Sequence, residues 1–194
     1  MGIRSSRHRI VNGRLFYLNL KRKTSRIMEK KPLVGIIMGS DSDFPKIKNA
    51  ITVLKDFEVP FEVHVMSAHR TPHLVEDFVG NARANGFRVI IAAAGGAAHL
   101  AGVAASHTTL PVIGIPVATE MMGGLDSILS TLQMPGDIPV ATVGTGSGGA
   151  KNAGLLAVEI LAVSDDAMAE KLTVYRKTLV EKILQKDAAL QEQI

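Results

Sequence analysis

The sequence predicts an α/β fold: a three-layer α/β/α sandwich around a doubly wound parallel sheet, flavodoxin-like or Rossmann-like, in a single domain with an extra C-terminal helix. From Pro32 onward, short apolar runs that end in Gly, Ser or Thr clusters alternate with stretches whose apolar residues recur every three or four positions. This alternation is typical of βαβ units. Runs such as Val-Ile-Ile-Ala-Ala-Ala at residues 89–94 are apolar throughout, which indicates strands with helices on both faces of the sheet.

The same patterns place the individual elements. Strands are expected at residues 33–38, 61–66, 89–93, 112–117 and 139–143. Helices are expected at residues 44–57, 72–85, 98–106, 125–132, 150–163 and 166–189. Pro45 stands where a first-turn proline is favoured, and Gly86 stands where a glycine ends a helix. With 194 residues in all, one such domain with a sizeable core is expected over residues 32–165.

Charge is unevenly distributed along the chain. Residues 1–31 hold ten Lys or Arg and one acid, a net of +9, whereas the other 163 residues hold 12 basic and 17 acidic side chains, a net of −5. The mildly acidic remainder argues against nucleic acid as the main partner. We expect residues 1–31 to be a basic, disordered extension. A true start at Met28, an organellar transit peptide and an ordinary extension are all compatible with it.

Composition also limits the chemistry and the location. The absence of cysteine excludes disulfides, a thiolate nucleophile and cysteine metal ligands. No uninterrupted apolar stretch approaches the roughly 20 residues that span a bilayer. We therefore expect a cytoplasmic protein without membrane contact.

The first polar loop is Gly39-Ser40-Asp41-Ser42-Asp43, between the first strand and its helix. Glycine lets a backbone approach a ligand, hydroxyls and helix N-terminal amides suit a phosphate, and a carboxylate can accept from ribose hydroxyls. A turn with a helix cap would use the same residue types. The loop by itself leaves both interpretations open.

The second polar loop, Ser67-Ala68-His69-Arg70-Thr71-Pro72, follows the second strand. Arginine offers a rigid, charged fork for a phosphate, and histidine titrates near neutrality. His69 and Arg70 are therefore candidate functional residues, with a structural loop histidine as the alternative. A metal site of His64, His69 and His73 is not expected, because no regular element aligns the three rings.

The third loop runs from Ala94 to Leu100, and its four small residues at 95–98 precede His99. Small side chains leave a pocket wall made mostly of backbone. Its amides can donate hydrogen bonds, and it can enclose a small apolar molecule such as carbon dioxide. Close helix–sheet packing is the alternative explanation, and His107 at a helix end is interpreted as structural. Ligands of doubly wound sheets bind beyond the carboxyl ends of the strands, where strand order reverses. We therefore expect the three loops to form one site.

A glycine-rich stretch, Gly144 to Gly149, matches the G-x-G-x-x-G dinucleotide fingerprint. That fingerprint needs a further strand with an acid about 20 residues later, but Asp165 and Asp166 introduce a terminal helix instead. A P-loop is also not expected, since Lys151 lies between Ala150 and Asn152 and the Gly-Lys-Ser/Thr core is missing.

Three segments together resemble the signature loops of a known family: Met38–Asp43, Ser67–Pro72 and Gly95–Leu100. The family is class I N5-carboxyaminoimidazole ribonucleotide mutase, often called the phosphoribosylaminoimidazole carboxylase catalytic subunit. The similarity covers roughly residues 32–165 and extends to Asp126-Ser127, Gln133-Met134-Pro135 and residues 152–157. Class II relatives typically have Lys where this chain has Arg70 and lack the Gly-Gly-Ala-Ala-His loop, so the resemblance is to class I. Ala101 departs from the family pattern, which usually has proline there.

The resemblance implies a role for each matching residue. Ser40, Ser42 and Arg70 would bind the phosphate, and Asp43 the ribose. His69 would be the general acid and base, and residues 95–100 would surround the imidazole and its carboxylate with His99 alongside. The implied catalytic residues are thus His69 and His99, and the implied substrate contacts are Gly39, Ser40, Ser42, Asp43, Ser67, Ala68, Arg70, Gly95, Gly96, Ala97, Ala98 and Leu100.

The reaction that the resemblance implies belongs to de novo purine biosynthesis. It converts N5-carboxyaminoimidazole ribonucleotide to 4-carboxy-5-aminoimidazole ribonucleotide by decarboxylation, carbon dioxide retention and recarboxylation at the ring carbon. No cofactor or metal is implied, and an ATP-dependent carboxyaminoimidazole ribonucleotide synthetase would act upstream. A homo-octamer is implied, with the helix at 166–194 packing on neighbouring subunits; packing on its own domain is the alternative.

Two rival functions remain compatible with the sequence. One is direct carboxylation of aminoimidazole ribonucleotide with carbon dioxide, as in class II, although Arg70 argues against it. The other is a non-catalytic nucleotide-sensing module on the same sheet.

Overall fold

A five-stranded parallel sheet organises residues 31–194, the part of the chain that the computed structural model describes. β1 (Val34–Met38) lies between β2 (Phe61–Val65) and β3 (Val89–Gly95), and β4 (Val112–Val117) and β5 (Ala141–Thr142) follow beyond β3. All four strand pairings are parallel. The order β2-β1-β3-β4-β5 is the flavodoxin-like order of doubly wound sheets, which confirms the predicted fold class.

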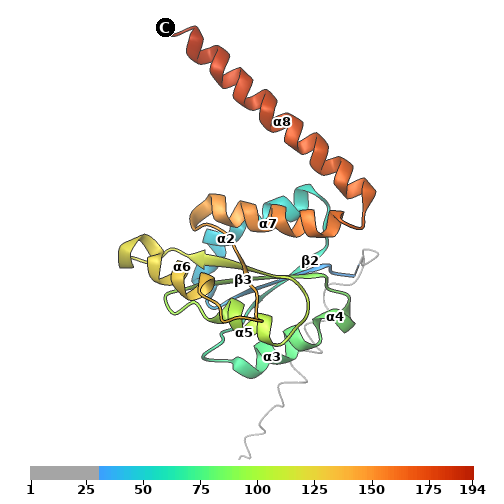
Figure 1. The fold of residues 1–194 in the computed structure, drawn as a ribbon, viewed down its shortest axis with the longest axis vertical. Helices are drawn as coiled ribbons and strands as arrows, with labels where there is room; N and C mark the ends of the chain where they lie inside the picture. Colours follow the sequence, from blue (N-terminus) through green and yellow to red (C-terminus); the bar gives the residue numbers. More distant parts are fainter. Residues whose placement is uncertain (1–30) are drawn as a thin grey trace, which may run out of the picture. The chain divides into compact units, whose positions relative to one another are not determined.

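Helices cover both faces of the sheet. α2 (Phe44–Asp56) and α7 (Gly146–Ala162) lie on one face, and α3 (Pro72–Gly80), α4 (Ala82–Asn85) and α5 (Leu100–Ser106) lie on the other (Figure 1). α6 (Leu125–Leu132) packs on the same face of β4 as α5: a Cβ added to Gly114 would overlap Thr131 of α6 and lie 3.3 Å from the Cβ of Ala101 in α5. The three layers are those that the sequence predicts.

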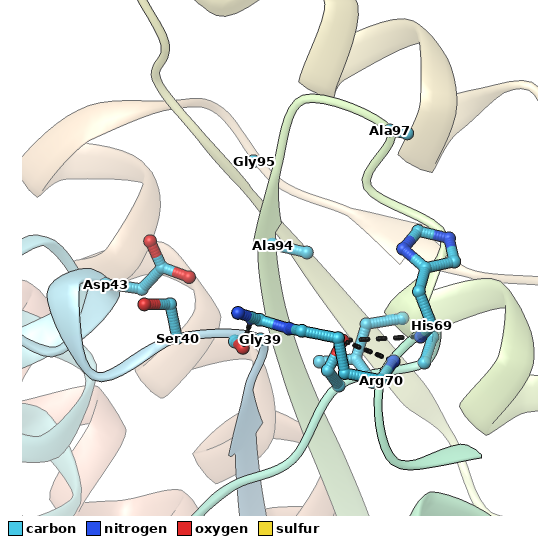
Figure 2. Close-up of a pocket in the computed structure, with 11 residues that line it drawn as sticks. Gly39, Ser40, Asp43, His69, Arg70, Ala94, Gly95 and Ala97 are labelled. Carbon is cyan, nitrogen blue, oxygen red and sulfur yellow. Dashed lines mark hydrogen bonds between the residues drawn. The ribbon is translucent and has the colours of Figure 1, made fainter.

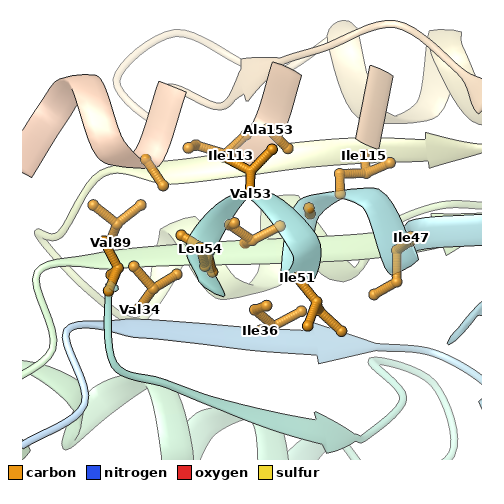
Figure 3. Close-up of a cluster of buried hydrophobic side chains, with 14 of the residues drawn as sticks. Val34, Ile36, Ile47, Ile51, Val53, Leu54, Val89, Ile113, Ile115 and Ala153 are labelled. Carbon is orange, nitrogen blue, oxygen red and sulfur yellow. The ribbon is translucent and has the colours of Figure 1, made fainter. Parts of the chain in front are cut away.

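The larger core cluster lies between the sheet and the α2–α7 layer (Figure 3). β1 shows why its sequence is apolar throughout: Ile36 packs in this cluster, whereas its neighbour Ile37 packs in the cluster on the opposite face, and both are fully buried. Each such side chain stabilises the fold by roughly 1.5–3 kcal/mol relative to an exposed position. β1 therefore carries apolar residues on both faces with no solvent-facing row, whereas Glu62 and Val65 of the edge strand β2 are exposed.

Several element boundaries differ from the predicted ones. The helix expected at 72–85 is divided into α3 and α4 at Asn81, whose side-chain amide donates to the Asp77 carbonyl at 2.8 Å. Gly86 does end this segment with a left-handed φ of 103°. The fifth strand is reduced to two residues, Ala141–Thr142. The helix expected from residue 98 begins at Leu100, because residues 96–99 form tight turns first.

A short 3-10 segment, η2 (Met121–Gly124), was not expected from the sequence. Met122 has a φ of 47°, and Gly123 and Gly124 follow with φ of 67° and 93°. A left-handed backbone is unfavourable for a residue with a side chain, and methionine gives no sequence signal for it. Both Met121 and Met122 are exposed.

The glycine-rich stretch at residues 144–149 has a packing role, which its likeness to a dinucleotide-binding motif did not predict. α7 begins at Gly146, earlier than the predicted start at residue 150. A Cβ added to Gly149 would overlap the carbonyl group of Gly144, so the chain folds back on itself where a side chain cannot fit. As expected, the next element is a helix, α8 (Asp166–Gln191), and the Asp165 carboxylate accepts from the Met168 amide at its N-terminus.

α8 packs on its own domain only along its first part. Met168, Leu172 and Tyr175 are half-buried against the core, and the Tyr175 ring lies edge-on to Phe57 with centroids 5.6 Å apart. Beyond them, Leu179 is still partly buried, but Val180, Ile183, Leu184 and Leu190 are exposed. Among residues 31–194, no helix combines the length and the hydropathy that a membrane crossing needs.

Gly154 sets how closely α2 and α7 approach. An added Cβ would lie 2.8 Å from the Ala50 carbonyl oxygen and 2.9 Å from the Val53 Cβ of α2. We expect Gly154→Ala to lower the free energy of unfolding by about 1–3 kcal/mol, because the two helices must move apart. Urea denaturation at one fixed protein concentration measures this change.

Gly148 is the matched control, since it lies in the same helix with nothing within 4 Å of an added Cβ. Gly148→Ala should raise the free energy of unfolding by about 0.5–1 kcal/mol through helix propensity. Equal effects of the two substitutions would contradict the close helix contact.

Candidate active site

The three polar loops meet at one edge of the sheet because their strands are neighbours. Met38, the last residue of β1, pairs with Val65 of β2 on one side and with Ala93 of β3 on the other. The loops that follow border a cavity of about 350 Å³, a size typical of small-molecule sites. It is lined by Gly39, Ser40, Asp43, Ser67, Ala68, His69, Arg70, Ala94, Gly95, Ala97 and Leu100 (Figure 2).

The β1 loop continues as η1 (Asp41–Asp43), which leads directly into α2. The Ser40 hydroxyl caps this turn: it accepts from the Ser42 amide at 3.3 Å and from the Ser42 hydroxyl at 2.8 Å. Asp43 is buried, and burial raises the pKa of its carboxyl above 3.8 against the opposing effects of Lys46 and Arg70. The loop therefore presents hydroxyls and a carboxyl group beside two cations.

Ser67 and Thr71 close the β2 loop into a rigid ring. The Thr71 hydroxyl accepts from the Ser67 amide at 2.9 Å, and the Thr71 amide donates to the Ser67 carbonyl at 2.9 Å. The buried Ser67 hydroxyl accepts from the amides of His69 and Arg70 at 3.3 and 3.2 Å. The backbone that carries His69 and Arg70 is thus fixed by four hydrogen bonds before any ligand binds.

The side chains of Arg70 and His69 diverge from this ring (Figure 2). Arg70 extends toward the β1 loop, where its guanidinium donates to the Gly39 carbonyl at 2.5 Å and lies near Ser40 and Asp43. His69 points toward Ala97 of the β3 loop (Figure 2). The cavity therefore has a cationic, hydroxyl-bearing end and an imidazole end.

His69 and His99 form a pair at the imidazole end. The His69 Nε2 lies 2.8 Å from the His99 Nδ1, with the rings at 85° to each other. One nitrogen must donate and the other accept, so the contact couples the tautomer of His69 to that of His99. Both rings are exposed, which leaves them accessible to a ligand in the cavity.

Most residues predicted for the site line the cavity, and four do not. Ser42, Gly96, Ala98 and His99 lie outside the lining: Ser42 contacts Ser40, and His99 contacts His69. Ala94 lines the cavity but was not among the predicted site residues, although the sequence places it in the third loop.

Ser127 of α6 also belongs to this region, because its hydroxyl accepts from the Gly96 amide. Only the family resemblance of Asp126-Ser127 pointed to it. Ala101, the departure from the family pattern, is buried in the first turn of α5.

His64, His73, His107 and the glycine-rich stretch lie apart from the cavity lining. His64 pairs with Glu62 at 3.2 Å and packs edge-on against Phe78, and His107 caps the end of α5. Within residues 31–194, no group of three or more His, Asp or Glu side chains is placed to bind a metal ion.

Comparison with known proteins agrees with the resemblance of the three loops. A family model described as AIR carboxylase matches residues 33–182. The chain belongs to the AIR carboxylase family. It is 54% identical over 160 residues to the N5-carboxyaminoimidazole ribonucleotide mutase of Synechocystis sp., covering 82% of this chain and 90% of that relative.

Further relatives support the same assignment. The enzyme of the same name from Bacillus subtilis is 51% identical over 155 residues, covering 80% of this chain and 96% of the relative. The crystal structure of Treponema denticola PurE superposes with a TM-score of 0.74 at 30% identity, covering 82% of this chain and 98% of that one. The family assignment and the fold thus agree.

The raised pKa of Asp43 has a consequence for stability. A raised pKa means that folding favours the protonated carboxyl, so this group's contribution to stability falls as pH rises through that pKa. We expect Asp43→Asn to raise the free energy of unfolding of the ligand-free protein at pH 7. The advantage should shrink as the pH falls through the raised pKa of Asp43, because the wild-type carboxyl then becomes neutral as well. Urea midpoints from neutral to acidic pH measure the difference.

Asp41→Asn is the matched control for Asp43→Asn, because Asp41 lies exposed on the same turn. Only the buried position should show a pH-dependent gain. A gain for Asp43→Asn that stays constant from neutral to acidic pH would contradict burial as its cause.

Proposed function

We propose that this protein is a 5-(carboxyamino)imidazole ribonucleotide mutase of de novo purine biosynthesis. The observation that carries the proposal is the polarity of the cavity: Arg70 and Ser40 lie at one end, and the His69–His99 pair lies at the other. A ribonucleotide has the same polarity, with a phosphate at one end and a base at the other. The relatives named as N5-carboxyaminoimidazole ribonucleotide mutases support it.

The cationic end is suited to the ribose phosphate. Arg70 offers several donors in a fixed fork, and its contact with a backbone carbonyl can be exchanged for a phosphate oxygen. Ser40 and Ser42 supply hydroxyls beside it, and Asp43 is positioned to accept from a ribose hydroxyl. Gly39 permits close approach, since an added Cβ there has nothing within 4 Å.

The imidazole end is suited to a base that exchanges carbon dioxide. Ala68, Ala94, Gly95 and Ala97 line the cavity there with little more than backbone and methyl groups, which leaves room for a planar ring. The residues from Gly95 to Leu100, Gly96 and Ala98 included, surround that ring and its carboxylate in this proposal. A wall of this kind can also retain a small apolar molecule.

The reaction needs one proton delivered and one removed. His69 protonates the carbamate nitrogen, the bond from that nitrogen to the carboxylate carbon breaks, and its electron pair stays on the nitrogen as carbon dioxide leaves. The ring carbon, made electron-rich by the amino group, then bonds to the carbon dioxide. His69 removes the proton from that ring carbon and restores the aromatic ring. One imidazole performs both transfers, and His99 orients it through the 2.8 Å contact.

The proposal includes the cellular setting. The reaction is balanced without ATP, biotin or a metal, and the enzyme acts in the cytoplasm on a substrate made by an ATP-dependent carboxyaminoimidazole ribonucleotide synthetase.

We also propose a homo-octamer in which the exposed apolar side chains of α8, such as Val180 and Ile183, pack on neighbouring subunits. Light scattering should give the mass of eight chains, and a monomeric mass would exclude this assembly.

The test of the proposed function is an ultraviolet assay with N5-carboxyaminoimidazole ribonucleotide, with and without ATP. We expect conversion without ATP in the wild type. In His69→Asn, kcat should fall by at least about 100-fold, because general acid–base catalysis contributes 10²–10⁴-fold. Binding of the ribonucleotide, measured by calorimetry, should be retained because the phosphate end is intact.

Arg70→Ala is the matched counterpart at the opposite end of the cavity. It should weaken ribonucleotide binding by about tenfold or more, as expected for a lost charge-assisted hydrogen bond. Unchanged affinity would show that the phosphate assignment is wrong. Binding without turnover in the wild type would indicate a nucleotide-sensing module, and turnover only with aminoimidazole ribonucleotide and carbon dioxide would indicate direct carboxylation.

A further inference from the structure

The β3 loop is fixed by a residue that does not line the cavity. Ser127, at the start of α6, is fully buried, and its hydroxyl accepts from the Gly96 amide at 2.9 Å. The same hydroxyl donates to the Val117 carbonyl at the end of β4, at 2.7 Å. One side chain therefore ties the loop to the neighbouring strand.

The start of α6 is itself anchored at this position. The Asp126 carboxylate accepts from the Thr119 hydroxyl and from the Ser127 amide, each at 2.8 Å. The bond from Thr119 is the main cause that lowers the pKa of Asp126, so the acceptor remains ionised at neutral pH. Ser130 lies one turn further along α6 with its hydroxyl 3.2 Å from the Gly96 carbonyl oxygen, but closer, at 2.7 Å, to the Asp126 carbonyl. Ser127 is thus the stronger of the two attachments.

The position of Gly96 determines that of the residues after it. Gly96 has a φ of 68°, and its carbonyl accepts from the Ala98 amide at 2.8 Å. The next turn forms in the same way, with the His99 amide donating to the Ala97 carbonyl at 2.8 Å. Ala97 lines the cavity and His99 contacts His69, so a shift at Gly96 would move both.

Gly95, on the other side of Gly96, is confined by β4. An added Cβ would lie 3.2 Å from the Val117 carbonyl oxygen, the same atom that accepts from Ser127, and 3.3 Å from the Thr119 Cγ2. The small-residue wall is therefore pressed against the end of β4 at the point where Ser127 binds. Without the Ser127 hydroxyl, the Gly96 amide and the Val117 carbonyl would both lose a partner, and the loop would have reason to move.

We infer that Ser127 is a positioning residue that keeps the Gly95–Ala97 wall closed over released carbon dioxide. The inference rests on the proposed function. After the carbamate bond breaks, the carbon dioxide either bonds to the ring carbon or diffuses away and leaves aminoimidazole ribonucleotide. Both outcomes are balanced without another reactant, and the wall determines their ratio. Ser127 acts on this ratio through Gly96, without touching the substrate.

The experiment compares the two products in wild type and Ser127→Ala. N5-carboxyaminoimidazole ribonucleotide is mixed with excess enzyme, and carboxylated product and aminoimidazole ribonucleotide are both quantified after separation. The uncatalysed loss of carbon dioxide, measured without enzyme, is subtracted. We expect the ratio of aminoimidazole ribonucleotide to carboxylated product to rise about tenfold, the effect of losing one buried hydrogen bond. This ratio does not depend on the fraction of enzyme that is folded.

Thr131→Val is the matched control for a purely structural effect. Thr131 is buried in the same helix and its hydroxyl donates to the Ser127 carbonyl at 2.8 Å, whereas the side chains that hydrogen-bond to Gly96 are those of Ser127 and Ser130. It should lower the melting temperature and leave the product ratio at the wild-type value. Ser127→Cys, which keeps a weakly hydrogen-bonding group, should give an intermediate ratio and decides the question if Ser127→Ala does not fold.

The outcomes separate this inference from the proposed function. A wild type that converts none of the carbamate overturns the proposed function. A wild type that converts it, with wild-type product ratios in Ser127→Ala or in Ser127→Cys, overturns the positioning role. Equal changes in the ratio for Thr131→Val and Ser127→Ala would also overturn it, because the effect would then be one of general stability.

Discussion

The pairing of β1 with β2 on one side and β3 on the other is the constraint on which the site depends. Met38 pairs with Val65 and with Ala93, so three loops far apart in sequence begin side by side. The register also fixes their depth relative to one another, because a shift by one residue would turn every side chain to the opposite face. The apolar core on both faces resists such a shift, and the positions of Arg70 and His69 follow from it.

Buried hydroxyls convert these loops from flexible connections into fixed supports. Ser67 accepts from two amides of the β2 loop, and Ser127 joins the β3 loop to β4. The titratable and charged side chains of the cavity region, those of His69, His99 and Arg70, are instead exposed. The two sets thus differ in burial: Ser67 and Ser127 are removed from water, where hydrogen bonds are less easily exchanged, whereas His69, His99 and Arg70 remain accessible to a ligand.

The fold and most of the residues that line the cavity could be predicted from the sequence, because both depend on local patterns. Apolar runs mark buried strands, and polar loops at strand ends mark the site. The left-handed backbone of Met122 could not be predicted, since methionine carries no signal for that conformation. The early start of α7 was missed because glycines indicate a loop, whereas here they permit Gly149 to lie against Gly144. The His69–His99 contact joins residues on different strands' loops, so only the sheet register could reveal it.

Asp43 shows how a site residue and the stability of the fold can oppose each other. Its carboxyl is buried beside Arg70 and Lys46, yet burial outweighs both cations and raises its pKa. In the ligand-free protein this arrangement leaves an ionised group incompletely solvated at neutral pH, which disfavours the folded state. In the proposed function, a ribose hydroxyl that donates to the carboxylate would add a second hydrogen bond to the one from the Ser40 backbone. Under the proposed function, this added bond would offset part of the desolvation cost that the ionised Asp43 carboxyl has in the free protein. A carboxylate that lowers stability in the free protein would then contribute to ligand binding.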